Sequence, residues 1–155
     1  MAYASQTIPD GYEGATPYLC RKDAAGALEF YKTAFGAKEL HRMPMPDGKV
    51  GHAEMQIGGA RVMLSDEFPE WGNLSPLSIG GSATTVLIYF EDVDAVVDRA
   101  VSAGAKLLQP PTDQFWGDRS CKLQDISGHT WMFATRKEDV PPEEMNKRAA
   151  AMFGS

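Results

Sequence analysis

Two stretches decide the fold: KDAAGALEFYKTAFGAKEL at residues 22–40 and EDVDAVVDRAVSAGAKLL at residues 91–108. Each contains an acidic residue that can cap a helix, then an apolar helical stripe, and closes on Gly-Ala-Lys and a leucine. The capping candidates Asp23 and Asp92 are 69 residues apart, and Gly36 and Gly104 are 68 apart. The sequence therefore predicts one supersecondary unit that occurs twice.

Each unit carries strand signals around its helix. A short apolar run precedes the helix, and strand-like segments separated by turn residues follow it. The turns are Pro46-Asp47-Gly48 and residues 58–59 in the first unit and residues 125–128 in the second, and strands of the second unit are expected at residues 83–90, 115–124 and 130–135. The order of each unit is thus β-α-β-β-β, which predicts an α+β fold.

The duplication divides the chain into segments. We expect a loose N-terminal arm (residues 1–14), a first βαβββ module (15–66), a linker loop rich in glycine and proline (67–81), a second βαβββ module (82–136) and a C-terminal helix within 137–155. Pro142 suits the first turn of that helix, because a first-turn residue needs no backbone N–H.

Composition narrows the class of protein. Hydrophobic residues make up 43% and charged residues 23%, as in ordinary globular chains. No stretch approaches the roughly 18–20 apolar residues of a membrane span, so we expect no membrane partner. The net charge of −6 and the scattered Lys and Arg argue against a nucleic-acid partner. Two cysteines are too few for a disulfide framework, and nothing marks a secretory signal, so we expect a cytoplasmic protein.

The tandem βαβββ order and four short motifs resemble a known superfamily. The motifs are GHAEM (51–55), VMLSD (62–66), FWGDR (115–119) and DISGHTW (125–131). Together they resemble the vicinal oxygen chelate superfamily of glyoxalases, bleomycin-resistance proteins and extradiol dioxygenases, and more narrowly its PhnB-like branch. The resemblance covers roughly residues 15–136. It implies that the modules curl into a mixed eight-stranded half-barrel around a cleft.

Catalytic members of this superfamily hold a divalent metal ion, and the resemblance identifies where its ligands would stand. The first-strand positions, seven residues before each capping aspartate, are Thr16 and Thr85. The last-strand positions, four residues after each turn glycine, are Met63 and Met132. Threonine and methionine are poor ligands for the cations that these enzymes use. We therefore expect no metal and no cofactor, and interpret Met63 and Met132 as an adaptable apolar floor of the cleft, or simply as core.

A polar pair lies on one predicted strand. His52 and Glu54 are two residues apart, so both side chains point to the same face. Four interpretations are open: a displaced metal site, with His129 as a further ligand, a general base, part of a polar pocket, or the polar face of a half-buried strand. His129 follows the turn residue Gly128, where a histidine more often bonds to backbone or solvent than to a metal ion.

An aromatic cluster marks the other candidate site. Phe115, Trp116 and Arg119 combine flat rings with a charged group, which is typical of a small-molecule cleft but equally of core packing beside a surface ion pair. If they begin a strand, only one of the two rings can face the cleft, and Arg119 faces the opposite side from Trp116 unless Gly117 forms a bulge. Trp71 in the linker is a candidate lid or dimer contact.

Three functions remain open at this point. The first is a homodimeric protein that binds a small organic ligand, aromatic or antibiotic, in a metal-free cleft. The alternative is a lyase, isomerase or dioxygenase of the same superfamily that uses a divalent metal. The third is a structural or regulatory dimer whose cleft has no ligand. The expected ligand-binding residues are Trp116, Phe115, His52, Glu54, Trp71, Arg119, Met63 and Met132.

Overall fold

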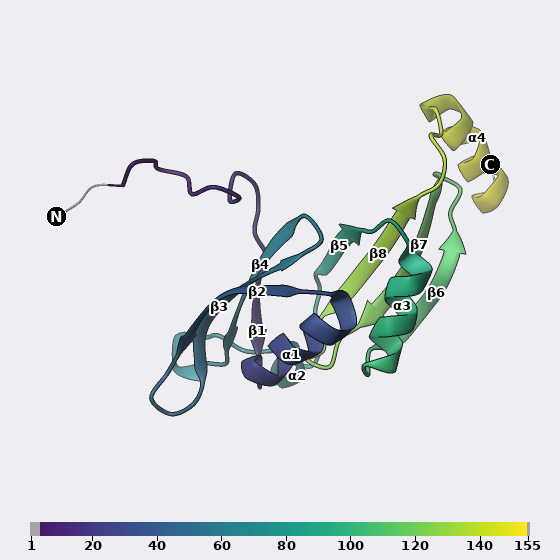
Figure 1. Cartoon of the computed structure of the whole chain (residues 1–155). Coiled ribbons are helices and arrows are strands. Elements are labelled where there is room, and N and C mark those ends of the chain that lie inside the picture. The colour runs from purple at the N-terminus through teal and green to yellow at the C-terminus, as the bar shows by residue number, and fades with distance from the viewer. Residues whose placement is uncertain (1–3, 155) are drawn as a thin grey trace.

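The computed structural model describes residues 4–154, and both predicted modules are present (Figure 1). The first contains β1 (Tyr18–Arg21), α1 (Ala24–Phe35), β2 (Lys38–Pro44), β3 (Val50–Ile57) and β4 (Ala60–Asp66). The second contains β5 (Thr85–Tyr89), α3 (Val93–Ser102), β6 (Lys106–Asp113), β7 (Asp118–Gln124) and β8 (Thr130–Arg136). Between the modules lie η1 (Pro69–Trp71) and α2 (Pro76–Ile79), and α4 (Pro142–Phe153) follows the second module.

The two sheets have the same topology. Their strand orders are β1-β4-β3-β2 and β5-β8-β7-β6, with the first pair of each sheet parallel and the other pairs antiparallel. The predicted tandem βαβββ units and the C-terminal helix are therefore confirmed. The eight strands are divided into two four-stranded mixed sheets. Across the described residues, no helix is both long and apolar enough to cross a membrane.

Matching contacts hold the start of each module's helix. The carboxylates of Asp23 and Asp92 accept hydrogen bonds from first-turn amides, as capping residues do. The last strand of each module in the sequence, β4 or β8, supplies a further acceptor, which binds the amide of the first residue of the helix. It is Asp66 Oδ1 for α1, at 2.9 Å, and Thr135 Oγ1 for α3, at 2.8 Å. Asp66 and Thr135 are 69 residues apart, so the duplication extends to this buried detail.

Helices α1 and α3 contact each other, and the two modules share one hydrophobic core (Figure 1). Aromatic side chains of α1 reach across to β8 of the other module. The centroid of the Phe35 ring lies 5.1 Å from that of Trp131 and 4.9 Å from that of Phe133, and both pairs pack edge to face. Such pairs contribute roughly 0.5–1.5 kcal/mol each beyond the burial of their surface.

A buried polar cluster also joins the modules. The carboxylate of Asp125, in the β7–β8 turn, lies 3.3 Å from the guanidinium of Arg21 on β1, and both side chains are fully buried. Tyr31 of α1 donates its hydroxyl proton to the same carboxylate, and Trp131 Nε1 donates to it at 2.7 Å. Burial lowers the pKa of Arg21 to about 10, which still leaves it a cation at neutral pH.

Two local expectations were wrong. Residues 115–117 do not begin a strand: they form the turn between β6 and β7, and β7 starts at Asp118. Gly117 has φ +100°, and its N–H bonds to Gln114 O, which closes the turn. The linker is not a plain loop, because η1 and α2 each begin with a proline and end at a left-handed glycine, Gly72 and Gly80.

The C-terminal helix begins at Pro142 as expected but leaves the body of the molecule, as does the N-terminal arm at the opposite end (Figure 1). None of its residues is buried, and Met152 and Phe153 are largely exposed. Arg148 makes two bonds of 2.8 Å to Glu138, in the segment that joins β8 to the helix, and one of 3.4 Å to Phe115 O of the β6–β7 turn. The apolar end of this helix is thus uncovered in the single chain.

Candidate functional site

The strand alternation gives each sheet a face that the helices do not cover. On β3 the buried Ala53, Met55 and Ile57 point to the shared core, and His52 and Glu54 point to the other side. We call this uncovered side of each sheet its cleft face. On the first sheet it includes Tyr18, His52, Glu54, Gln56 and Met63, and on the second Leu87, Tyr89, Asp118, Lys122 and Met132.

Hydrogen bonds connect the polar side chains of the first cleft face into a chain. Tyr18 Oη lies 2.6 Å from His52 Nδ1, and His52 Nε2 lies 3.1 Å from Glu54 Oε1. Tyr12, from the N-terminal arm, donates to the other carboxylate oxygen of Glu54 at 2.6 Å. The guanidinium of Arg61 lies over the Tyr12 ring, 5.0 Å from its centroid. The predicted pair of His52 and Glu54 is therefore the centre of a larger polar cluster.

This cluster keeps Glu54 ionised and its tyrosines protonated. The hydrogen bond from Tyr12 and then that from His52 lower the pKa of Glu54 below its usual value. The bond to Glu54 raises the pKa of Tyr12. Burial raises the pKa of Tyr18. A carboxylate, an imidazole and a neutral phenol thus follow one another along the first cleft face.

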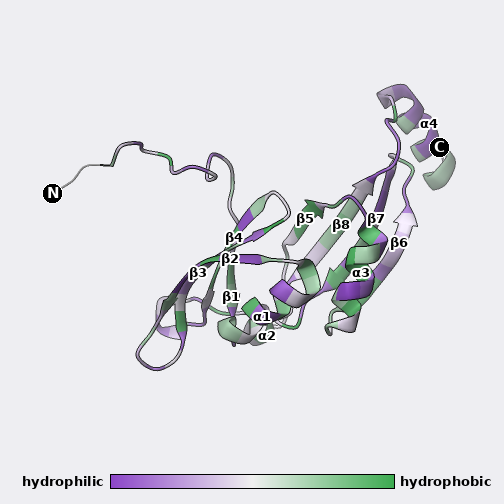
Figure 2. Cartoon of the chain, in the orientation of Figure 1, coloured by the Kyte–Doolittle hydropathy of each residue, from purple (hydrophilic) through white to green (hydrophobic). Residues whose placement is uncertain are grey.

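The second cleft face is apolar along β5 and polar along β7. In Figure 2, β5 is coloured as hydrophobic over much of its length, and its Leu87 and Tyr89 are about half exposed. Leu87 pairs with Met132 on β8, which pairs in turn with Lys122 on β7. Near the far end of this face, Asp118 accepts hydrogen bonds from Tyr89 Oη at 2.6 Å and from an indole N–H of the β6–β7 turn at 3.0 Å.

That indole belongs to Trp116. Its bond to Asp118, which also binds Tyr89, places it beside the second cleft face. Phe115 packs edge to face on Trp116, with ring centroids 5.0 Å apart. It also packs edge to face on Phe153 of α4, with ring centroids 6.0 Å apart. Because both rings belong to a turn, strand alternation does not decide which of them faces the cleft.

Two other predicted residues lie elsewhere. Arg119 is on the helix side of β7, where Asp94 of α3 binds it at 2.7 and 2.9 Å and Asp113 at 3.0 Å. The structure therefore does not bring Arg119 to the cleft face, where it was expected to bind a ligand, because these carboxylates hold it on the opposite side of β7. Trp71 is 70% exposed and packs on Phe68, with ring centroids 4.9 Å apart, in the segment between the modules.

The positions at which the superfamily would bind a metal ion do not suit one. Met63 lies beside Tyr18, Met132 lies beside Leu87, and Thr85 is the first residue of β5. Thr16 precedes β1. Within residues 4–154, no three His, Cys, Asp or Glu side chains converge as a metal site would require. The donors present at these positions thus do not fit the metal ion of the catalytic relatives.

His129 serves the contact between modules. Its Nε2 lies 3.0 Å from Cys20 O on β1, and burial lowers the pKa of its imidazole, which favours the neutral form. A neutral imidazole that donates to a carbonyl oxygen is structural, in line with the turn position. Both cysteines are free, and burial raises the pKa of each thiol, which makes Cys20 and Cys121 poor nucleophiles.

A cavity of about 330 Å³ lies between β1 and β5, at the seam of the two modules. Tyr18 lines it, so the hydrogen-bonded chain of the first cleft face begins at its wall. The other lining residues are Pro17, Leu19, Ser82, Thr84, Thr85, Val86 and His129. We call this space the seam cavity.

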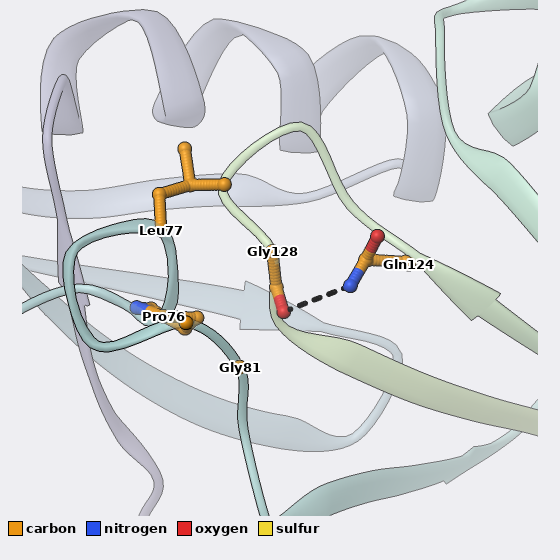
Figure 3. Close-up of a pocket in the computed structure, with 6 residues that line it drawn as sticks. Pro76, Leu77, Gly81, Gln124 and Gly128 are labelled. Atoms are coloured by element: carbon orange, nitrogen blue, oxygen red, sulfur yellow. Dashed lines mark hydrogen bonds between the residues drawn. The ribbon is translucent and has the colours of Figure 1, made fainter.

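A second hollow, of about 260 Å³, lies between α2 and the β7–β8 turn (Figure 3). Gly128 O accepts a hydrogen bond of 3.3 Å from Gln124 Nε2 at its wall, and Pro76 and Leu77 face the same turn. None of the residues that line it is titratable, and glycines form much of the wall. The seam cavity, with Tyr18 and His129, offers more chemistry to a ligand.

Comparison with known proteins identifies the class. The model of the Glyoxalase/Bleomycin resistance protein/Dioxygenase superfamily matches residues 15–133. The chain therefore belongs to this superfamily, and the resemblance inferred from the sequence is confirmed at that level. Membership of the PhnB-like branch stays a prediction.

The chain is also similar to individual proteins of other organisms. An uncharacterized protein of Mycobacterium tuberculosis H37Rv is 41% identical over 133 residues, which cover 84% of this chain and 78% of that protein. An uncharacterized protein of Arabidopsis thaliana is 30% identical over 124 residues, or 76% of this chain and 74% of its own length.

Two solved structures show the same fold. TioX from Micromonospora sp. ML1 has a TM-score of 0.65 and 27% identity, with 83% of this chain and all of TioX covered. The fosfomycin resistance protein FosX of Listeria monocytogenes, solved with Mn(II) and sulfate, has a TM-score of 0.60 and 18% identity, with 88% and 98% covered. At that identity, the likeness to FosX concerns the fold alone.

Sequence reasoning missed three tyrosines. Tyr18 was within reach, because it lies two residues after Thr16 and strand alternation puts such residues on one face. Tyr89 could be found by the same argument, because it lies four residues after Thr85 on one strand and therefore shares its face. Tyr12 gave no signal, because the arm has no periodicity and its contact with Glu54 spans 42 residues of sequence.

Proposed function

We propose that the protein binds a small organic molecule with a planar aromatic part, without a metal ion, in a cleft lined by the two cleft faces. The observation that carries the proposal is the set of residues at the superfamily's metal positions, Thr16, Met63, Thr85 and Met132. A cleft with methionine and tyrosine at its floor suits an apolar ligand better than a hydrated cation. Ligand binding of this kind includes sequestration of an aromatic antibiotic.

The two cleft faces offer such a ligand different groups. The second cleft face offers Leu87, Met132 and the neighbouring Trp116 to an apolar ring. The first offers the hydroxyl of Tyr18, which is 54% exposed, to an oxygen or nitrogen atom. Most ligand sites combine a largely apolar lining with a few fixed polar groups in this way.

The proposal includes a homodimer whose clefts are completed by both chains, located in the cytoplasm. In the single chain, Leu87 and Tyr89 of β5 and Met152 and Phe153 of α4 are all exposed, and large apolar side chains left exposed favour association. Both cysteines are free thiols, which suits a reducing compartment. Light scattering at micromolar concentration should give twice the chain mass of 16.9 kDa. A mass of one chain would refute the dimer.

The binding test uses naphthol, a planar aromatic probe with one hydroxyl group. Its addition to protein dialysed against a chelator should quench tryptophan fluorescence in a saturable way. Trp116→Ala should weaken binding by about 2- to 10-fold, which corresponds to the loss of one ring contact. Trp71→Ala is the matched control and should bind as the wild type does. Equal affinity in wild type and Trp116→Ala would remove Trp116 from the site and make Trp71 the candidate.

A further inference from the structure

We propose that the first cleft face carries a metal-free proton relay, in which Tyr18 is the catalytic acid–base and His52 and Glu54 are positioning residues. The reaction class is proton transfer between two atoms of one ligand, an isomerisation. The inference rests on the proposed function, because it needs a ligand in the cleft. It goes beyond that function, since binding alone needs no relay.

With a neutral imidazole, the order of the contacts sets the direction of proton flow. An imidazole has two nitrogens, and in the neutral ring one donates while the other accepts. Glu54 can only accept, so His52 Nε2 carries the proton over the 3.1 Å contact. His52 Nδ1 is then the acceptor, and Tyr18 donates its phenolic proton to it over 2.6 Å. A base in contact with a hydroxyl group and oriented by a carboxylate is the arrangement that activates such a group.

The Tyr18 end of the relay is its most exposed part along the chain from Tyr18 through His52 to Glu54. The side chains of His52 and Glu54 are 23% and 24% exposed, whereas Tyr18 is 54% exposed and lines the seam cavity. Tyr12 occupies the remaining oxygen of Glu54, so this carboxylate is held from both sides. A ligand in the seam cavity can therefore reach Tyr18 Oη before the other members of the relay.

The step balances without a co-reactant. A ligand C–H or O–H bond breaks as its proton moves to Tyr18 Oη, and the phenolic proton of Tyr18 moves to His52 Nδ1. The ligand becomes an anion, and the imidazolium lies between Glu54 and Tyr18. Return of both protons along the same path, to a different atom of the ligand, completes the isomerisation and restores the relay. No oxidant or reductant is required.

The second cleft face lacks this relay. The positions that match His52 and Glu54 in the strand register hold Ser120 and Lys122, and Leu87 matches Tyr18. Tyr89 does meet a carboxylate there, but directly, with no imidazole between them. Tyr89→Phe is therefore a matched control for Tyr18→Phe, because it removes a cleft-face hydroxyl group that is bonded to a carboxylate.

The probe is nitrobenzisoxazole, a planar aromatic compound. A base that removes its ring C–H proton breaks the N–O bond and releases a coloured cyano-nitrophenolate. We expect the wild type to catalyse this reaction with saturation. Tyr18→Phe and His52→Gln should each lower kcat by about 100-fold with KM changed less than about twofold, since acid–base catalysis contributes about 10²–10⁴. Glu54→Gln should lower kcat by about 10-fold, and Glu54→Asp should restore part of it, which a purely structural role would not predict.

The outcomes separate the relay from ligand binding, which is followed by tryptophan fluorescence with naphthol. Saturable naphthol binding without catalysis of nitrobenzisoxazole overturns the relay and leaves the proposed function standing. A rate unchanged in Tyr18→Phe overturns the role of Tyr18, and an equal loss in Tyr89→Phe overturns the assignment to the first cleft face. If neither naphthol nor nitrobenzisoxazole binds, both the proposed function and the relay are contradicted.

Discussion

The first cleft face carries a hydrogen-bonded chain of tyrosine, histidine and glutamate, whereas the second, built on the same strand order, has leucine, serine and lysine at the matching positions. The strand registers match the positions one to one: Tyr18 with Leu87, His52 with Ser120, Glu54 with Lys122, and Met63 with Met132. Only the methionine is common to both. The duplicated backbone was thus kept while the side chains that face the cleft diverged, so the two halves offer a ligand different chemistry.

The largest loss of stability is expected from a substitution of Asp125, a residue of the second module that has no acidic counterpart in the first. The position that matches it in the register is Ile57, which is fully buried in the core. Asp125→Ala leaves Arg21 as a buried cation without its partner and removes the acceptor of Tyr31 and Trp131. We expect the free energy of unfolding to fall by about 3–5 kcal/mol in urea titrations.

A matched variant sharpens that comparison. Gln56→Ala removes a hydrogen bond at the equivalent turn of the first module, where Gln56 Nε2 donates to Gly58 O at 3.1 Å. This bond is exposed, and its loss should cost under about 1 kcal/mol. If Asp125→Ala costs as little as Gln56→Ala, the polar cluster does not hold the two modules together.

The next largest loss of stability is expected from alanine substitutions at two glycines in turns that are 69 residues apart, Gly48 and Gly117. Both glycines have left-handed φ angles, +86° and +100°. A Cβ atom at Gly48 would meet nothing within 4 Å, but at Gly117 it would lie 2.4 Å from Glu138 O. We expect Gly48→Ala to cost about 1 kcal/mol and Gly117→Ala about 2–3 kcal/mol in thermal or urea unfolding. Equal costs would show that the contact with residue 138 is readily displaced.

The smallest effect is a pH dependence confined to the first module. Hydrogen bonds from Arg42 and Lys32 lower the pKa of Glu39 to about 2. Its register match, Leu107, has no charge. A carboxyl group whose pKa is depressed in the folded state stabilises the protein above its unfolded pKa, and this contribution is lost as the pH falls toward the folded value.

We therefore expect wild type to exceed Glu39→Gln in stability by under about 1 kcal/mol near neutral pH. The difference should shrink as the pH falls from about 4.5 toward about 2. Urea titrations of both proteins across this range measure it. A difference that grows on acidification would mean that protonation of Glu39 strengthens the fold, contrary to the ion pairs seen here.

The sequence predicted the fold well because its signals are local and repeated. Asp23 and Asp92 cap their helices as expected, and the hairpin turns lie where glycine and proline placed them. It failed at residues 115–117, where aromatic residues suggested a strand but the left-handed Gly117 makes a turn. Propensity cannot decide such a case, because the backbone angle of one glycine overrides its neighbours.

The site was only partly predictable for a different reason. Alternation along β3 correctly placed His52 and Glu54 on one face, which is a local property of a strand. The partners that give them chemistry come from far away in the sequence: Tyr18 is 34 residues from His52, and Tyr12 is 42 from Glu54. A single sequence contains no pattern that reveals such pairs, so the polar chain required the tertiary structure.

The central claim is that this cleft binds its ligand without a metal ion, and one titration tests it most directly. Naphthol is titrated into the protein after exhaustive chelation, with metal content measured on the same sample, and again after a divalent ion is restored. The account predicts saturable quenching of tryptophan fluorescence in the metal-free sample, with the same affinity when zinc, manganese, iron or nickel is present. Binding that appears only when the ion is restored, with about one ion held per chain, would contradict it.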